Sequence, residues 1–153
     1  MTAERAFSIL NLIAMVGWLP LLFRPRARWA SEVVPVVVPA LLAMVYVALV
    51  VTTLPGSHGG FSSLAGVRTL FGNPWALLAG WTHYLAFDLF IGGWIVRDAR
   101  QRGVSHLFVV PALVLTFLLG PGGLLLYLGV RTVGGSSSLS PSASLELELE
   151  PEP

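Results

Sequence analysis

The sequence predicts an all-α, polytopic membrane protein with four transmembrane helices in one bundle. Hydrophobic residues make up 55% of the 153 residues and charged residues only 11%, whereas a soluble domain carries roughly 25% charged residues. Four apolar stretches are long enough to cross a hydrocarbon core of about 30 Å, which takes about 20 residues of helix. No soluble domain is inserted between them.

The predicted transmembrane helices are residues 6–23, 33–54, 75–96 and 107–130. The first ends in the basic run Arg-Pro-Arg-Ala-Arg and has no small-x-small cleavage site. We therefore interpret it as a retained helix and not as a signal peptide.

The loop between the second and third helices contains the segment FSSLAGVRTLF, residues 61–71. Phe61, Leu64, Val67 and Phe71 recur at spacings of three and four, which predicts a short helix with one apolar face. We expect this helix to lie in the membrane interface. It is either a lid or lipid-entry gate, or a covered segment that rests on the bundle.

The composition changes after Arg131, first to Gly, Ser and Pro and then to alternating Leu and Glu. Such a segment cannot bury a core. Residues 132–153 are therefore expected to form a disordered Ser/Pro/Glu-rich tail, with pairing of the Leu-Glu segment as a strand on a partner as the alternative. Residues 1–131 then form the transmembrane domain.

The arginines predict the orientation, because Lys and Arg are enriched in cytoplasmic loops. Six of the nine lie in the loops after the first and third helices, and Arg5, Arg68 and Arg131 lie on the other side. Both termini are therefore expected to be non-cytoplasmic.

The composition also excludes several kinds of chemistry. The chain has no Cys, which excludes disulfides, thiolate catalysis and iron–sulfur clusters. Only one His lies within a predicted helix, so we expect no metal site, and nothing in the sequence implies a cofactor. A net charge of +1 gives no reason to expect nucleic acid as a partner.

Two ionisable residues lie within the third helix, where such groups are costly and mark candidate functional sites. Asp88 is near the middle of the helix, and His83 lies about 7–8 Å nearer the outer end. Asp88 is the candidate acid and His83 the candidate base. The alternative is a hydrogen-bonded clasp between helices.

Other polar groups and a helix break fall at similar depths, which suggests a pocket in the outer half of the membrane. The Gly-Pro-Gly-Gly run starting at Gly120 is either a simple kink or a cavity wall, because irregular backbone at membrane depth is tolerated only inside protein or beside a cavity. The candidate substrate-binding residues are Asn11, Tyr46, Trp81, Tyr84, Thr116, Gly120, Pro121 and Gly123.

The run FGNPWALLAGWTHYLAFDLFIGGWIVRDAR, with GPGGLLLY downstream, resembles the small membrane-protein family of the plant abscisic-acid-deficient, neoxanthin-forming protein. The resemblance covers roughly residues 5–131. Its most specific part is Gly80-Trp81-x-His83-Tyr84-x-x-Phe87-Asp88-Leu89-Phe90, joined to Trp94 and Asp98 and followed by Gly120-Pro121-x-Gly123. The absence of a plastid transit region suggests a bacterial relative, located in the inner membrane.

The resemblance implies a role in carotenoid metabolism, where the plant protein is linked to converting violaxanthin into neoxanthin. In that isomerisation a 5,6-epoxide opens and a neighbouring proton leaves, with no net redox change. The expected ligand is a carotenoid or related isoprenoid membrane lipid. The alternatives are a non-enzymatic lipid-binding or scaffolding subunit, which would contact pathway enzymes or further copies of the chain, and a small transporter.

Overall fold

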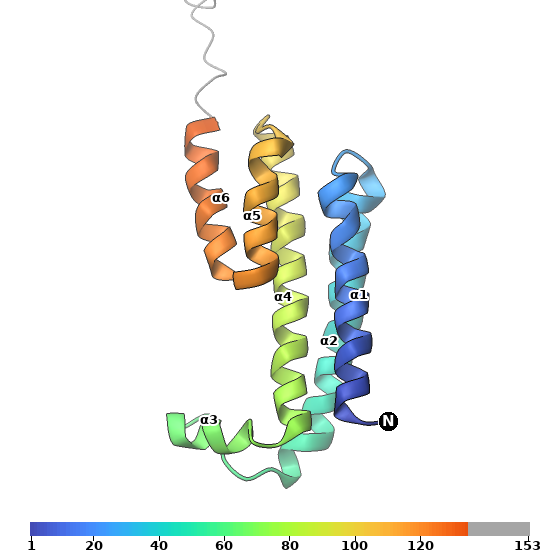
Figure 1. The fold of residues 1–153 in the computed structure, drawn as a ribbon, viewed down its shortest axis with the longest axis vertical. Helices are drawn as coiled ribbons and strands as arrows, with labels where there is room; N and C mark the ends of the chain where they lie inside the picture. Colours follow the sequence, from blue (N-terminus) through green and yellow to red (C-terminus); the bar gives the residue numbers. More distant parts are fainter. Residues whose placement is uncertain (135–153) are drawn as a thin grey trace, which may run out of the picture.

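The computed structural model describes residues 1–134, and every regular element in this part of the chain is a helix. Figure 1 shows three long helices side by side, a short helix across one end, and two half-length helices toward the other end. The all-α fold class is confirmed. The α-helices are α1 (Ala3–Phe23), α2 (Val34–Thr53), α3 (Leu64–Leu70), α4 (Pro74–Gln101), α5 (His106–Leu119) and α6 (Pro121–Gly134), with a π-helical turn η1 (Trp29–Val33) and a 3-10 turn η2 (Leu54–Gly56) on either side of α2.

Two helical segments, Ala3–Phe23 and Trp29–Gly56, are long and apolar enough to cross a membrane. α4 also has 28 residues, but it carries charged side chains. Large apolar side chains point outward over much of the surface: Leu12, Met44 and Phe87 are each about 60% exposed. Large exposed apolar surfaces are rare on soluble monomers and mark contact with a membrane or another protein.

The ends of the long helices follow local sequence signals. The Asn73 side chain accepts a hydrogen bond from the Trp75 backbone N–H at 2.9 Å, with Pro74 as the first residue of α4, which is the usual place for proline in a helix. After α4 the chain turns at Gly103, whose φ of 68° favours glycine. The predicted boundaries of the first three transmembrane helices agree with the observed ends of α1, α2 and α4 within about five residues.

α4 is the central helix and contacts α1, α2, α5 and α6. Glycines let its neighbours approach closely, as they commonly do between membrane helices. A Cβ on Gly92 would lie 2.6 Å from Cη2 of Trp18 on α1, and one on Gly93 would collide with Pro35 on α2. Neither position can accept a larger residue without moving a helix.

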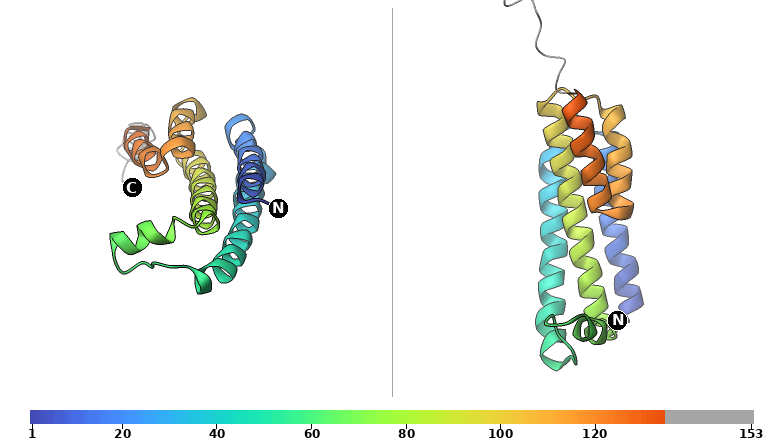
Figure 2. Two further views of the ribbon diagram at one scale, coloured as in Figure 1. Left: turned by 60° about the horizontal axis from the view of Figure 1, so that its bottom comes forward. Right: turned by 90° about the vertical axis from the view of Figure 1, so that its left-hand side faces the viewer.

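The fourth predicted transmembrane helix, 107–130, is wrong as a single helix. α5 ends at Leu119, and after Gly120 helix α6 runs back beside α5 along the half of α4 that leads to Gln101 (Figure 2). Gly120 has a φ of 51°, which glycine adopts readily. A helix of 14 residues is about 21 Å long, too short to cross a core of about 30 Å. The Gly-Pro-Gly-Gly run is therefore a reversal of the chain and not a kink.

Because of the α5–α6 hairpin, the described chain ends on the other side of the bundle from where a single fourth helix would end. α6 finishes at the same end of the bundle as the α1–α2 and α4–α5 loops, opposite the start of α1 (Figure 1). Arg131 on α6 lies 3.7 Å from Asp98 on α4. The prediction that both termini are non-cytoplasmic stays a prediction, and the described part of the chain starts and ends at opposite ends of the bundle. Helix α6 includes residues 132–134 of the predicted tail, and residues 135–153 lie outside the described residues.

α3 lies across the end of the bundle, close to the start of α4 (Figures 1 and 2). It is shorter than the predicted segment 61–71, and the Ser63 hydroxyl caps it by accepting a hydrogen bond from Gly66 N–H at 3.0 Å. The predicted apolar face is only partly correct. Leu70, which is not on that face, is buried, whereas Leu64 is 86% exposed.

The hairpin predicts which chain ends share a side of the membrane. Reporter domains fused after Gly134 and inserted between residues 101 and 104 should give the same signal, and a reporter fused before Ala3 should give the opposite one. A fusion inserted at residue 58, in the loop before α3, serves as a control and should match the N-terminal fusion. Opposite signals at Gly134 and the α4–α5 loop would mean that residues 106–134 cross the membrane.

Candidate functional site

The structure separates the two ionisable residues that the sequence places together in the third long helix. His83 points toward α2, where its ring lies 5.4 Å from the ring of Tyr46, and it stacks on Phe87 at 4.5 Å. Asp88 points instead toward the α5–α6 turn at Gly120. A spacing of five residues turns about 140° around a helix, and no bend in α4 corrects for it. The two side chains therefore belong to different faces of α4.

Asp88 is buried at the fifteenth of the 28 positions in α4. A Cβ at Gly120 would lie 3.0 Å from Asp88 Oδ1 and 3.4 Å from Oδ2. Gly120 is thus required twice, once for its backbone conformation and once for the space that Asp88 occupies. The chain reversal and the carboxylate form one local structure.

Tyr84 is the polar neighbour of Asp88. Its hydroxyl is close to the Asp88 carboxylate and donates a hydrogen bond to the Phe117 carbonyl at 3.3 Å. A tyrosine has one O–H to donate, and Asp88 Oδ2 has no hydrogen-bond partner among the described residues. Buried polar atoms are nearly always paired, so an unpaired one requires an explanation. A missing ligand or substrate group is one such explanation.

The remaining predicted residues of the hairpin pack α5 against α6. The Thr116 hydroxyl donates to the Ala112 carbonyl at 2.8 Å, and a Cβ on Gly123 would collide with Thr116. Pro121 is the first residue of α6. Thr116 and Gly123 hold the two half-helices close together, and Gly120 lies between them in the chain.

A second polar group continues from Tyr84 toward α1. The Trp81 ring lies 5.2 Å from the Tyr84 ring, and its Nε1–H donates to Asn11 Oδ1 at 3.2 Å. Asn11 in turn donates through Nδ2 to the Phe7 carbonyl at 2.8 Å. Three of the predicted binding residues, Asn11, Trp81 and Tyr84, are therefore in one connected group.

Two cavities lie beside α4 near the end covered by α3. The smaller, of about 260 Å³, is lined by residues from α2 and α4 and by residues near α3, including Tyr46, Leu70 and His83. The larger, of about 520 Å³, lies between α1 and α4 and is lined by residues including Phe7, Trp81 and Tyr84. Asp88 lines neither cavity; it lies one helical turn beyond Tyr84.

Phe71 and Gly80 line both cavities. A Cβ on Gly80 would lie 3.2 Å from ring atoms of Phe71, so the phenyl ring rests directly on the glycine. The ring separates the His83 cavity from the Trp81 cavity. The sequence analysis assigned Phe71 to the apolar face of the short helix but did not identify its contact with Gly80.

At the opposite end of α4, Asp98 is the centre of a polar cluster whose contacts were not predicted from the sequence. The Tyr127 hydroxyl donates to Asp98 Oδ2 at 2.5 Å, and Arg102 and Arg131 lie 2.9 and 3.7 Å from the same oxygen. Trp94 packs against both Tyr127 and Arg131. The spacing of Asp98 and Arg102, four apart on a helix, was the available signal. The cluster fastens α6 to α4.

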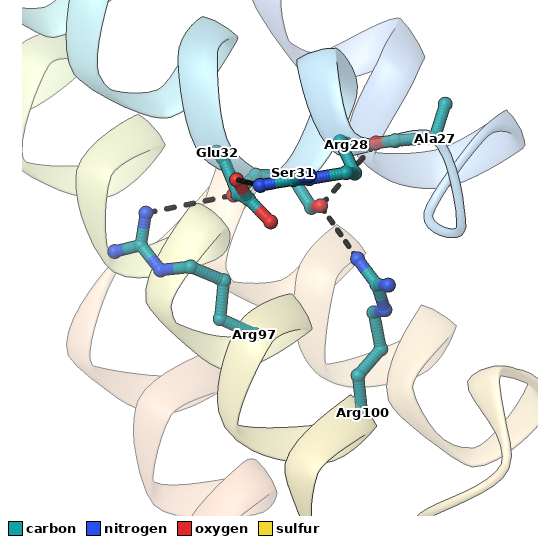
Figure 3. Close-up of polar contacts among 6 residues, drawn as sticks. All are labelled: Ala27, Arg28, Ser31, Glu32, Arg97 and Arg100. Atoms are coloured by element: carbon teal, nitrogen blue, oxygen red, sulfur yellow. Dashed lines mark hydrogen bonds and ion pairs between the residues drawn. The ribbon is translucent and has the colours of Figure 1, made fainter.

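A second arginine cluster joins α4 to η1. Arg100 donates to the Ser31 hydroxyl at 2.7 Å, and Arg97 donates to the Ser31 carbonyl at 3.5 Å (Figure 3). π-helical turns are rare and often occur at functional sites. Among the described residues, no three His, Cys, Asp or Glu side chains are grouped closely enough to hold a metal ion.

The described part of the chain is thus all-α, with two helical segments long and apolar enough to cross a bilayer and a carboxylate buried at the centre of α4. A family model matches residues 5–127, and the chain belongs to that family, described as ABA DEFICIENT 4-like. The resemblance found in the sequence is confirmed. No curated protein and no solved structure matches the chain. Family membership and the apolar helices support a membrane location.

The Asp98 cluster predicts a pH dependence of stability. Burial raises the pKa of Asp98, but the hydrogen bonds from Tyr127 and Arg102 and the charges of Arg102 and Arg131 lower it below its usual value overall. The folded state therefore binds its proton less tightly than the unfolded state, and the stabilisation is lost as the pH falls through the acidic range below about 4.

Thermal unfolding in detergent should show this loss. From pH 7 to pH 3 the melting temperature should fall more for the wild type than for Asp98→Asn, which carries no charge at either pH. Glu4→Gln, at an exposed residue with no ion pair among the described residues, should keep the wild-type pH dependence. An equal fall for Asp98→Asn would exclude Asp98 as the source.

Proposed function

We propose that this protein is an integral membrane protein that binds a carotenoid or related isoprenoid lipid and isomerises it by acid–base chemistry at Asp88. The observation that carries the proposal is the unpaired Asp88 Oδ2, buried in the middle of α4 beside Tyr84. An ionisable group at that depth is costly and is by default a functional group. Membership of the ABA DEFICIENT 4-like family suggests the ligand class.

In the proposed membrane placement α1, α2 and α4 cross the bilayer, and the α5–α6 hairpin enters it only to mid-depth. The end of the bundle that holds the α1–α2 loop carries seven arginines, and the positive-inside rule makes that end cytoplasmic. The N-terminus and α3 are then on the other side, with α3 in the interface. The seven are Arg24, Arg26, Arg28, Arg97, Arg100, Arg102 and Arg131.

The two cavities lie in the non-cytoplasmic half and suit an elongated apolar ligand. Their walls are mostly apolar, with aromatic rings from Tyr46, Phe71, Trp81 and Tyr84. Binding sites for small apolar ligands are typically of this composition, with few polar groups to fix orientation. A ligand that displaces the Phe71 ring from Gly80 would occupy both cavities at once, with one end near Tyr46 and the other near Tyr84.

The chemistry follows from one carboxyl group. In its protonated form Asp88 gives a proton to an oxygen of the bound lipid, such as that of an epoxide, and the C–O bond breaks. The resulting carboxylate then takes a proton from the neighbouring carbon, so that a double bond forms. The product has the same atoms as the substrate, and no electrons are gained or lost. Tyr84 lies beside Asp88 and connects it to the larger cavity.

His83, the base candidate from the sequence, has a different place in this proposal. It lines the smaller cavity beside Tyr46, on another face of α4 from Asp88. We assign it to ligand binding, where the imidazole offers a hydrogen bond to a hydroxyl or carbonyl group at the far end of the lipid.

One observation favours a second candidate function. Asp88 is not among the residues that line either cavity, so a ligand can bind there without reaching the carboxylate. The protein would then bind the lipid for another enzyme, as a non-catalytic subunit. The two functions differ in whether the purified protein alone converts a substrate.

The catalytic proposal predicts the effect of Asp88→Asn. The purified variant, incubated with a 5,6-epoxycarotenoid in detergent, should form product at least about a hundredfold more slowly than the wild type, because removing a catalytic acid typically costs 10²–10⁴-fold. Its melting temperature should stay within a few degrees, since hydrogen bonds between membrane helices average only about 0.6 kcal/mol. Chromatography of the pigments measures the rate.

Asp98→Asn is the matched control, because it makes the same change on the same helix away from the cavities. It should keep the wild-type rate at neutral pH and a temperature well below melting. Full activity of Asp88→Asn would exclude the acid–base role. A wild-type protein that binds the pigment but forms no product alone would support the non-catalytic function.

The binding groove predicts a separate effect for Gly80→Val. The new side chain would occupy the space beside Phe71 through which the proposed ligand passes, so a polyene should bind roughly tenfold more weakly, a loss of about 1.4 kcal/mol. Quenching of the tryptophan fluorescence by added carotenoid gives the affinity. Gly129→Val is the control, since nothing lies within 4 Å of a Cβ at Gly129. Equal affinities for the two variants would place the ligand elsewhere.

A further inference from the structure

The contact between α4 and η1 has features of an anion site. Arg97 and Arg100 are three residues apart and so lie on one face of α4. Both reach toward the same residue, Ser31, which is fully buried in the π-helical turn (Figure 3). The contact is outside the cavities and the Asp88 region.

These two arginines have unused hydrogen-bonding capacity. A guanidinium has five N–H donors, and in the described part of the chain Arg97 and Arg100 each make one hydrogen bond, to uncharged oxygens of Ser31. Three other arginines form ion pairs with carboxylates: Arg102 and Arg131 pair with Asp98, and Arg28 pairs with Glu32 at 3.5 Å. Arg97 is also partly buried, which limits the water that can reach it.

The depth of the pair along α4 indicates what lies beside it. Arg97 and Arg100 are nine and twelve residues beyond Asp88, about 14 and 18 Å along the helix axis. With Asp88 at the centre of a hydrocarbon core of about 30 Å, the core ends about 15 Å away. The guanidinium groups are therefore at the level of the lipid headgroups. Trp29, half exposed in η1, is of a type enriched at that level.

The local charge is positive. Arg28, Arg97 and Arg100 carry three positive charges against one negative charge on Glu32 (Figure 3), which leaves a net charge of +2. Arginine binds phosphate through two parallel N–H···O bonds, which makes it suited to headgroup phosphates. Basic pockets between helices on the cytoplasmic side are a known form of lipid headgroup site.

We propose that Arg97 and Arg100, which Ser31 holds side by side, bind the phosphate group of an anionic membrane phospholipid at the end of the bundle that carries the α1–α2 loop. The proposal rests on the membrane placement given above but not on the carotenoid chemistry. The lipid phosphate joins α4 to η1 and thereby stabilises the contact between α2 and α4.

The test compares melting temperatures of the purified protein in neutral detergent with added phosphatidylglycerol, phosphatidylcholine or inorganic phosphate. A ligand of the folded state raises stability with its concentration. We expect phosphatidylglycerol to raise the melting temperature by several degrees, as an excess of about a hundredfold over Kd would do. We expect little change with phosphatidylcholine or inorganic phosphate. An equal rise with either of these would overturn the proposal.

Variants locate the effect. Arg97→Gln with Arg100→Gln should lose the phosphatidylglycerol increment and, in native mass spectrometry, the bound lipid. Arg24→Gln with Arg26→Gln removes the same charge from exposed residues of the same surface and should keep both. Equal losses in the two double variants would mean that only the overall charge matters, and would contradict a site at Ser31.

A third variant tests the site without removing an arginine. Glu32→Gln raises the local net charge from +2 to +3 and should increase the phosphatidylglycerol increment. The test is therefore available even when the double variant at Arg97 and Arg100 does not accumulate. A smaller or unchanged increment in Glu32→Gln would count against the proposal. Because pigment conversion is not measured, failure here leaves the proposed function at Asp88 untouched.

Discussion

The architecture depends on glycines at the contacts of α4. Because a glycine has no Cβ, the neighbouring group can approach the backbone closely at each of these contacts. Trp18 packs on Gly92, Pro35 on Gly93 and Phe71 on Gly80, while the carboxylate of Asp88 occupies the space beside Gly120. Lipid tails are as apolar as leucine, so helices in a membrane gain little from hydrophobic burial and depend on close packing instead. The same four contacts fix α1, α2, the segment after α3 and the hairpin around one axis.

Close packing along α4 also explains how a carboxylate can stay buried at the centre of the helix. The hairpin places Gly120 against the Asp88 carboxylate and offers the Phe117 carbonyl to the Tyr84 hydroxyl, so that Oδ2 has no hydrogen-bond partner among the described residues. A fully paired carboxylate would be a structural clasp. A carboxylate with one free oxygen, held next to a tyrosine, retains the capacity to exchange a proton with a ligand, which is why we place the proposed chemistry there.

Hydrophobicity predicted the helical class and three of the long helices, because about 20 apolar residues in a row leave few alternatives to a helix. It did not predict the hairpin: residues 107–130 satisfy the same length criterion, and only the φ of Gly120 and its contact with Asp88 show the reversal. The spacing of five residues between His83 and Asp88 already indicated that their side chains lie on different faces of the helix, since five residues turn about 140°. The Ser31 and Asp98 clusters were not identified, since they join segments from 29 to 69 residues apart.

In the proposed orientation, the hairpin makes the molecule wedge-shaped. Of the described helices, five pass through the Arg-rich leaflet and three through the other, so the protein takes up more lateral area in the first. Lipids must redistribute between the leaflets to compensate. Packing stress is lowest where the Arg-rich leaflet is the convex one, so the shape of the protein alone gives it a preference among flat and curved regions of a membrane.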